Sequence, residues 1–214
     1  MLEKKQKRFY DLVSYVFMPL LIPLYSMIFL FQLEHFTGRF AHSGQSLVVF
    51  KWITFSGTIL FTIVLPVIPL YILKKRGQIS DFFISKKEQR AVPYFLGFLS
   101  YAFWAIFLRY ILIGMPAYVV GLGVGSVVSV FLVFLINFKW KISAHLAGIG
   151  GFVGGVFGLC FLMGINPVWF LILILFFSIL VGLARVELRA HTPSQVLAGF
   201  MLGFLIVFLC CVRF

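Results

Sequence analysis

Seven long apolar stretches constrain the fold of this chain more than any other feature. One helical crossing of a bilayer needs about 20 consecutive, mostly apolar residues. The stretches lie at about 12–33, 47–73, 93–113, 117–138, 143–163, 167–183 and 194–213. Charged residues make up 11% of the chain, whereas about 25% is typical of a soluble domain. The sequence therefore predicts an all-α, polytopic transmembrane helical bundle of six or seven spans, folded as a single integral membrane domain over 1–214.

Two places along the chain allow more than one arrangement of the spans. Only Gly114-Met115-Pro116 separates the third stretch from the fourth, and Arg109 lies within the third, so a re-entrant pair is an alternative to two full crossings. The sixth stretch is short, and it either tilts or continues into the segment around Arg185.

Basic residues gather in four segments that seven crossings would bring to one side of the membrane. These segments lie near 1–11, 74–92, 139–142 and 184–193, and they hold 14 of the 18 lysines and arginines. Positive charge in short loops is typical of the cytoplasmic side. The pattern predicts a cytoplasmic N-terminus, in what we expect to be a bacterial inner membrane. Topology and anionic lipid headgroups account for the net charge of +12, so nucleic acid is not an expected partner.

Small and sulfur-containing residues within the stretches are assigned to packing. Gly150, Gly154 and Gly158 share one face of a helix, and small residues four apart let helix backbones approach closely. The three cysteines lie in apolar runs without the spacing of metal ligands. No metal and no other cofactor is expected.

Polar residues suited to phosphate chemistry precede two of the stretches. His191 lies six residues after Arg185 and directly before a Thr-Pro pair, which suits the N-cap and first turn of a helix. Ser143 and His145 lie at the start of the fifth stretch. Helix N-termini favour anions, and arginine binds phosphate oxygens through paired hydrogen bonds. A neutral histidine can attack phosphorus, and a protonated one can donate to the leaving oxygen.

These residues resemble the signature of the type 2 phosphatidic acid phosphatase superfamily, which includes the vanadium haloperoxidases. The third part of that signature is Ser-Arg, five residues, His, three residues and Asp. Here Ala184-Arg185, His191 and Gln195 hold these positions, and Val-Leu-Ala-Gly follows as in the family. The second part is Pro-Ser-Gly-His, which here is Ile142-Ser143-Ala144-His145. The resemblance covers about residues 85–205.

The first part of the signature has a weaker counterpart. The family pattern is Lys, six residues and Arg-Pro. With Arg90 as the family arginine, Phe83 takes the lysine position and the proline is displaced to Pro93. Lys87 lies in the same segment and is the lysine that we expect to serve instead, whereas Lys141 is interpreted as a topology anchor.

The resemblance implies hydrolysis of a phosphate ester through a phosphohistidine, without a metal. His191 would attack phosphorus, and His145 would protonate the leaving lipid oxygen. The phosphate oxygens would be held by Arg185, Ser143, Arg90 and Lys87. Gln195 replaces the aspartate that orients the nucleophilic histidine, and its amide oxygen can still accept a hydrogen bond. Glu187 or Glu88 is an alternative source of a carboxylate.

Three functions are compatible with these residues. The one that we expect is an integral membrane phosphatase acting on a phosphorylated lipid, namely phosphatidate, a polyprenyl phosphate or diphosphate, or lipid A, with the tails in the bilayer. The second is a catalytically impaired homologue that binds phospholipid headgroups or scaffolds a membrane complex, which Gln195 favours. The third is a small transporter or channel subunit, and the stretches hold few polar residues other than Arg109 to support it.

Overall fold

Helices make up all the regular structure that the computed structural model describes, in residues 4–42, 46–84 and 86–214. Seven helical segments are long and apolar enough to cross a membrane. In chain order they are α1 (Lys4–Val16) with α2 (Ile22–Leu30), α4 (Leu47–Ile59) with α5 (Leu65–Lys75), α6 (Ala91–Ile106), α7 (Ala117–Lys139), α8 (Ala144–Met163), α9 (Val168–Glu187) and α10 (Pro193–Arg213). A π-helical turn, Leu60–Val64, joins α4 to α5, another, Phe107–Ile111, extends α6, and the short α3 covers Glu34–Thr37. The predicted all-α transmembrane fold is confirmed.

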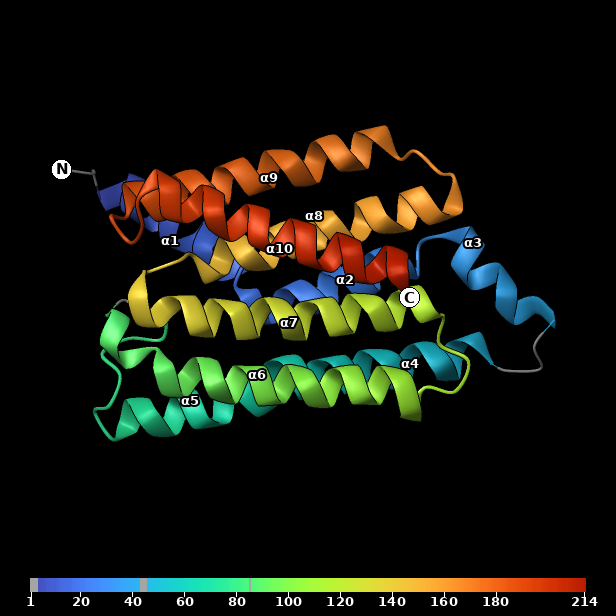
Figure 1. The fold of residues 1–214 in the computed structure, drawn as a ribbon, viewed down its shortest axis with the longest axis horizontal. Helices are drawn as coiled ribbons and strands as arrows, with labels where there is room; N and C mark the ends of the chain where they lie inside the picture. Colours follow the sequence, from blue (N-terminus) through green and yellow to red (C-terminus); the bar gives the residue numbers. More distant parts are fainter. Residues whose placement is uncertain (1–3, 43–45, 85) are drawn as a thin grey trace.

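The two ambiguous places in the sequence have definite structures. Helices α6 and α7 pack side by side and run the length of the bundle (Figure 1), so they form two crossings and not a re-entrant pair. Helix α9 continues to Glu187, so the short sixth stretch extends through Arg185.

The first predicted span, 12–33, corresponds to the helical segment Lys4–Leu30, which is not one continuous helix. Helix α1 ends at Val16, a 3-10 turn follows at Pro19–Leu21, and α2 starts at Ile22. Proline lacks an amide hydrogen and disfavours a helical conformation in the residue before it. Met18 accordingly has the extended angles φ −60° and ψ 136°. Helix α1 is thus a separate amphipathic helix with its lysines and its arginine exposed.

Helix α8 is the most buried of the membrane-spanning helices, and it packs along α10. The predicted glycine face is confirmed. A side chain at Gly150 or Gly154 would collide with the backbone carbonyl of Phe200 or Phe204 on α10, and one at Gly203 would collide with that of Ala147 on α8. Glycine is required at this interface because the two backbones are almost in contact.

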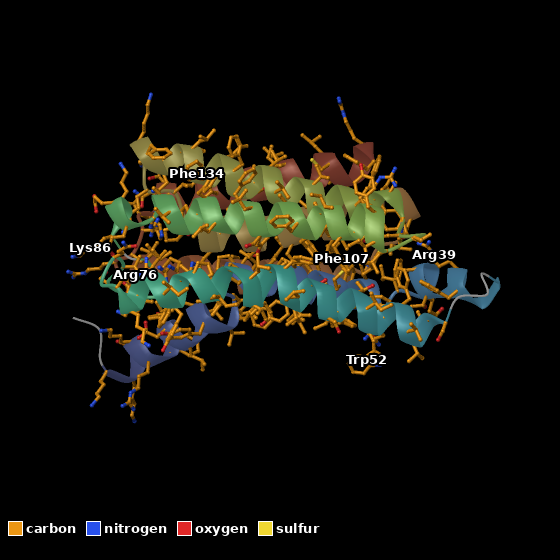
Figure 2. The ribbon with its side chains drawn as sticks, turned by 90° about the horizontal axis from the view of Figure 1, so that it is seen from below. Arg39, Trp52, Arg76, Lys86, Phe107 and Phe134 are labelled. Carbon is orange, nitrogen blue, oxygen red and sulfur yellow. The ribbon has the colours of Figure 1, made fainter. Side chains whose placement is uncertain are left out.

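The four basic segments lie together at one end of the bundle. Figure 1 shows the start of α1, the α5–α6 connection, the end of α7 and the α9–α10 turn at the same end. Arg76 and Lys86 lie at this end in Figure 2, and Arg39 lies at the other. Large apolar side chains such as Trp169 are exposed on the outside of the bundle, as a lipid environment requires. The candidate catalytic residues sit at the basic end.

Candidate active site

Four of the residues singled out in the sequence meet at the basic end of the bundle and are buried there. Arg90 precedes α6, His145 lies in the first turn of α8, Arg185 lies in the last turn of α9, and His191 lies in the α9–α10 turn. Their side chains are between 1% and 7% exposed. Ionisable groups are costly to bury near hydrocarbon, so their concentration here is typical of a functional site.

Two local features of the chain hold His191 in place. The backbone amides of Ala190 and His191 both donate to the carbonyl of Arg185, which ends α9 in a tight turn. Thr192 and Gln195 then form a capping box at the start of α10, as the Thr-Pro pair predicted for the helix start. The turn between the two helices is therefore fixed at both ends.

The ring of His191 has a defined tautomer. Its Nδ1 lies 3.2 Å from the side-chain oxygen of Gln195 and 3.1 Å from the backbone oxygen of Lys141. The backbone oxygen of Lys141 can only accept. The Gln195 atom accepts from the amide of Thr192, so it is the amide oxygen and it too can only accept from the ring. Nδ1 therefore carries the proton, and Nε2 keeps the lone pair that a nucleophile needs. Gln195 thus contacts the ring through its side-chain oxygen.

Burial, followed by the positive charges of Arg90 and Arg185, lowers the pKa of His191 to about 3. The imidazole is therefore neutral at pH 7, the protonation state in which it can attack phosphorus. Burial and the same two arginines also lower the pKa of Lys141. The sequence interpretation treated Lys141 as a topology anchor, whereas its backbone and its charge both act on this site.

The two arginines have different amounts of hydrogen-bonding capacity left for a ligand. Arg90 donates from Nε to the carbonyl of Ile84 at 2.8 Å and from Nη1 to that of Ile142 at 3.4 Å. Arg185 donates from Nη1 to the hydroxyl of Ser14 at 3.3 Å. Its Nε is buried and has no hydrogen-bond partner among the described residues. Such a donor is costly unless an acceptor reaches it, and a phosphate oxygen is suitable.

Ser143 and His145 occupy the start of α8. The Ser143 hydroxyl caps the helix by accepting from the amide of Leu146, and its own amide donates to the backbone oxygen of Gln195. The starts of α8 and α10 are thereby joined. His145 Nε2 lies 3.2 Å from the carbonyl oxygen of Ser14, so this nitrogen carries a proton. The remaining ring nitrogen, Nδ1, is the one available for proton exchange with a substrate.

Lys87 is not directed at the phosphate-binding groups. Its ammonium donates to the carbonyl of Lys139 at the end of α7, 3.1 Å away. Phe83, which takes the family lysine position, lies with its ring centroid 5.9 Å from that of His145 and 5.4 Å from the Arg185 guanidinium carbon. An aromatic ring thus contacts the two groups where the family pattern would place an ammonium.

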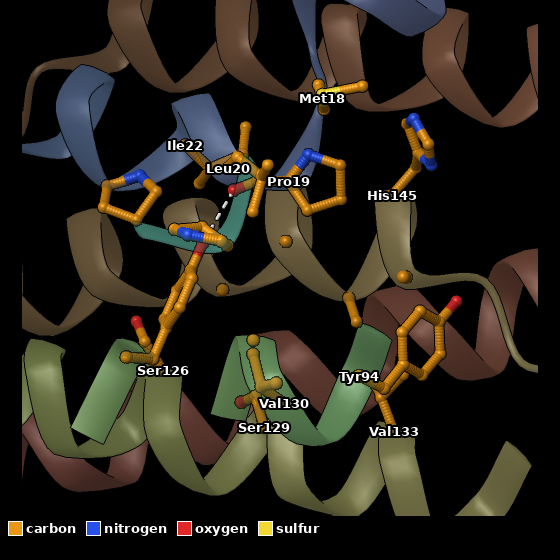
Figure 3. Close-up of a pocket in the computed structure, with 18 of the residues that line it drawn as sticks. Met18, Pro19, Leu20, Ile22, Tyr94, Ser126, Ser129, Val130, Val133 and His145 are labelled. Carbon is orange, nitrogen blue, oxygen red and sulfur yellow. Dashed lines mark hydrogen bonds between the residues drawn. The ribbon is translucent and has the colours of Figure 1, made fainter. Parts of the chain in front are cut away.

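An apolar cavity of about 160 Å³ extends from these residues into the bundle. Figure 3 shows His145 and Tyr94 at one end of the cavity and Ser126 at the other. Ser126 lies thirteen residues before the end of α7, or about 20 Å along the helix axis. The Ser129 hydroxyl, one turn nearer the site, is buried and has no hydrogen-bond partner among the described residues. The cavity therefore continues from the site into the interior of the bundle along α7.

The profile of the PAP2 superfamily matches residues 25–214, which is most of the chain. The chain belongs to the PAP2 superfamily. Membership confirms the resemblance predicted from the motifs, and it supports a phosphatase-type function in a membrane setting. No curated protein and no solved structure matches the chain. The matched region starts within α2, so α1 lies outside it.

Proposed function

We propose that this PAP2 protein is an integral membrane phosphatase that hydrolyses a phosphorylated lipid through a phosphohistidine. The observation that carries the proposal is the convergence of a neutral histidine, His191, with the buried guanidinium of Arg185, whose Nε has no partner among the described residues. The first group can attack phosphorus, and the second can bind the charge that develops on its oxygens.

The reaction follows from the nitrogen atoms that the geometry leaves available. His191 Nε2 attacks phosphorus, and the bond from phosphorus to the lipid oxygen breaks. His145, whose Nε2–H is held by the carbonyl of Ser14, takes a proton at Nδ1 from the singly protonated phosphate and passes it to that oxygen. Water then attacks phosphorus, the bond from phosphorus to Nε2 of His191 breaks, and the water proton passes through Nδ1 of His145 to the phosphate, which leaves as inorganic phosphate. Arg185, Arg90 and the hydroxyl of Ser143 hold the phosphate oxygens during both steps.

The cavity supports a lipid as the substrate. Its walls beyond His145 are mainly apolar and belong to the interior of the bundle. Apolar walls accept an alkyl chain at little cost, because a tail that leaves the bilayer exchanges one apolar environment for another. Phosphatidate, a polyprenyl phosphate or diphosphate, and lipid A all provide such tails. The sequence interpretation left the tails in the bilayer, whereas this cavity lets a segment of one enter the protein.

The test is release of inorganic phosphate from these lipids by the purified, detergent-solubilised protein, with glycerol phosphate as a tail-free comparison. His191→Ala should abolish release, and His35→Ala should retain it, because His35 lies in α3, far along the chain from either motif. Turnover by His191→Ala at the rate of the unmodified protein would contradict the mechanism. Equal turnover of glycerol phosphate would contradict the lipid assignment.

A non-catalytic role is the second candidate, and Gln195 favours it. An amide does not stabilise the cation that forms on His191 as a carboxylate does. In that case the protein would bind phospholipid headgroups or scaffold a membrane complex. Tight binding of orthovanadate without phosphate release from any lipid of the panel would support this function.

The side of the membrane on which the site acts is a separate proposal. The basic end of the bundle carries the N-terminal cluster, and the positive-inside rule places it in the cytoplasm. Labelling a single cysteine placed at Ser80 with a membrane-impermeant reagent in intact cells tests this. Ser80 is exposed in the α5–α6 connection, so labelling from outside would reverse the orientation.

A further inference from the structure

The N-terminal helix α1 brings one fully buried polar residue, Ser14, into the site. Ser14 is 0% exposed, although most of α1 is exposed, and the neighbouring Val13 packs into the apolar cluster of α8 and α9. Ser14 lies outside the part of the chain that the PAP2 profile matches. Its contacts with the site therefore belong to a segment that the family signature does not include.

Ser14 contacts two of the groups assigned to chemistry, through two different oxygens. Its carbonyl accepts from Nε2 of His145 at 3.2 Å, and its hydroxyl accepts from Nη1 of Arg185 at 3.3 Å. The first contact occupies Nε2, so proton exchange with a substrate would use Nδ1. The second holds the guanidinium by one terminal nitrogen, while Nε has no partner among the described residues.

Tyr15, the residue after Ser14, makes a further contact between the end of α1 and the site. The ring of Tyr15 lies 4.5 Å from that of Phe83, which in turn contacts His145 and Arg185. The end of α1 and the segment around Phe83 thus close on the same two groups. Phe83 takes the family lysine position, so no ammonium is present there. The orientation of Arg185 depends instead on the hydroxyl of Ser14 and on the ring of Phe83.

We propose that Ser14 is a positioning residue of the phosphate site, acting through Arg185 and His145. This rests on the proposed phosphatase function. Ser14→Ala keeps the carbonyl contact to His145 and removes only the hydroxyl, so the guanidinium loses one of its fixed points. A hydrogen bond to a charged group is strong enough that its loss should weaken phosphate binding about tenfold.

The experiment uses the full-length protein in detergent and measures two quantities, the dissociation constant of orthovanadate and the kcat/KM for the lipid that the panel identifies. Ser14→Ala should weaken vanadate binding about tenfold and lower kcat/KM to a similar extent. Ser14→Thr, which keeps the hydroxyl, should restore most of both. Ser178→Ala is the matched control, because Ser178 is also buried and its hydroxyl donates to the carbonyl of Ile174 in its own helix. The melting temperature shows that each variant is folded.

The outcomes separate the two proposals. Unchanged vanadate affinity in folded Ser14→Ala overturns the role of Ser14, whether or not the protein releases phosphate. An equal loss in Ser178→Ala overturns it as well, because the effect would then come from any buried serine. Weakened vanadate binding without phosphate release by the unmodified protein supports the role of Ser14 and contradicts the phosphatase. Weakened binding together with lower kcat/KM supports both.

Discussion

Gln195→Glu tests whether a neutral partner limits the reactivity of His191. The side chain of Gln195 reaches Nδ1 of His191 at 3.2 Å and the amide of Thr192 at 3.2 Å. Glutamate has the same length and is equally suited to a capping box, so both contacts should persist. The substitution therefore changes the charge at this oxygen and very little else.

The expected magnitude follows from the single contact that changes. A hydrogen bond between neutral groups contributes about 0.5–1.5 kcal/mol, and one to a charged group about 1.5–3 kcal/mol. A gain of about 1.4 kcal/mol for the cation that forms on His191 corresponds to a rate increase of about tenfold. The same gain raises the pKa of His191 by about one unit from its value of about 3, so the ring stays neutral at pH 7.

The assay is phosphate release at saturating lipid, with Gln195→Ala as the opposite perturbation. The alanine variant loses the contact to His191 and half of the capping box, so we expect a slower rate and a helix destabilised by about 1 kcal/mol. A Gln195→Glu protein that is folded, as its melting temperature shows, but turns over no faster would refute the reasoning. Normal turnover by Gln195→Ala would show that Gln195 does not orient the ring.

Three further predictions concern packing, pH and phosphate binding. Gly203→Val should lower the melting temperature, because the added side chain meets α8 backbone and overpacking costs about 1–3 kcal/mol, whereas Gly97→Ala, with open space around it, should not. Because the pKa of His191 is about 3 in the folded protein and 6.5 in the unfolded chain, the free energy of unfolding should be highest above pH 6.5 and fall as the pH drops toward 3. The expected loss is about 2 kcal/mol between pH 7 and pH 5. His191→Gln should flatten the dependence of the melting temperature on pH. Arg90→Met should lower kcat/KM at least a hundredfold and Lys87→Met less than threefold, because only the arginine is buried among the site residues; equal effects would restore Lys87 to the site.

Hydropathy predicted the spans because a helix in lipid must satisfy its own backbone, which makes the length of each apolar run informative. Six of the seven stretches match a helical segment to within four residues at each end. The first does not, because Pro19 and Pro23 interrupt a run whose composition is continuous. Composition measures whether a segment is apolar, and proline determines whether it forms one helix.

The sequence predicted that two pairs of residues would meet, Arg185 with His191 and Ser143 with His145. Each pair is local to a helix end, and the topology puts both helix ends on one side of the membrane. Ser14 was not predicted to join them, since it contacts His145 and Arg185 across 131 and 171 residues. One serine in an apolar run carries no sign of a distant partner. Lys87 had the expected charge and segment, but its ammonium donates to the carbonyl of Lys139 at the end of α7, a contact that the sequence does not indicate.

The neutral Gln195 also bears on which of the two functions the site favours. Arg90 and Arg185 are buried close to His191, and their positive charges favour an anion in the site at every stage of a reaction. Interactions that bind substrate, intermediate and product equally improve affinity without raising the rate of the chemical step. A carboxylate at position 195 would weaken anion binding and stabilise the cationic His191 that forms only during the reaction. Gln195→Glu should therefore raise turnover and loosen vanadate together, and a site selected for binding alone would show only the loosening.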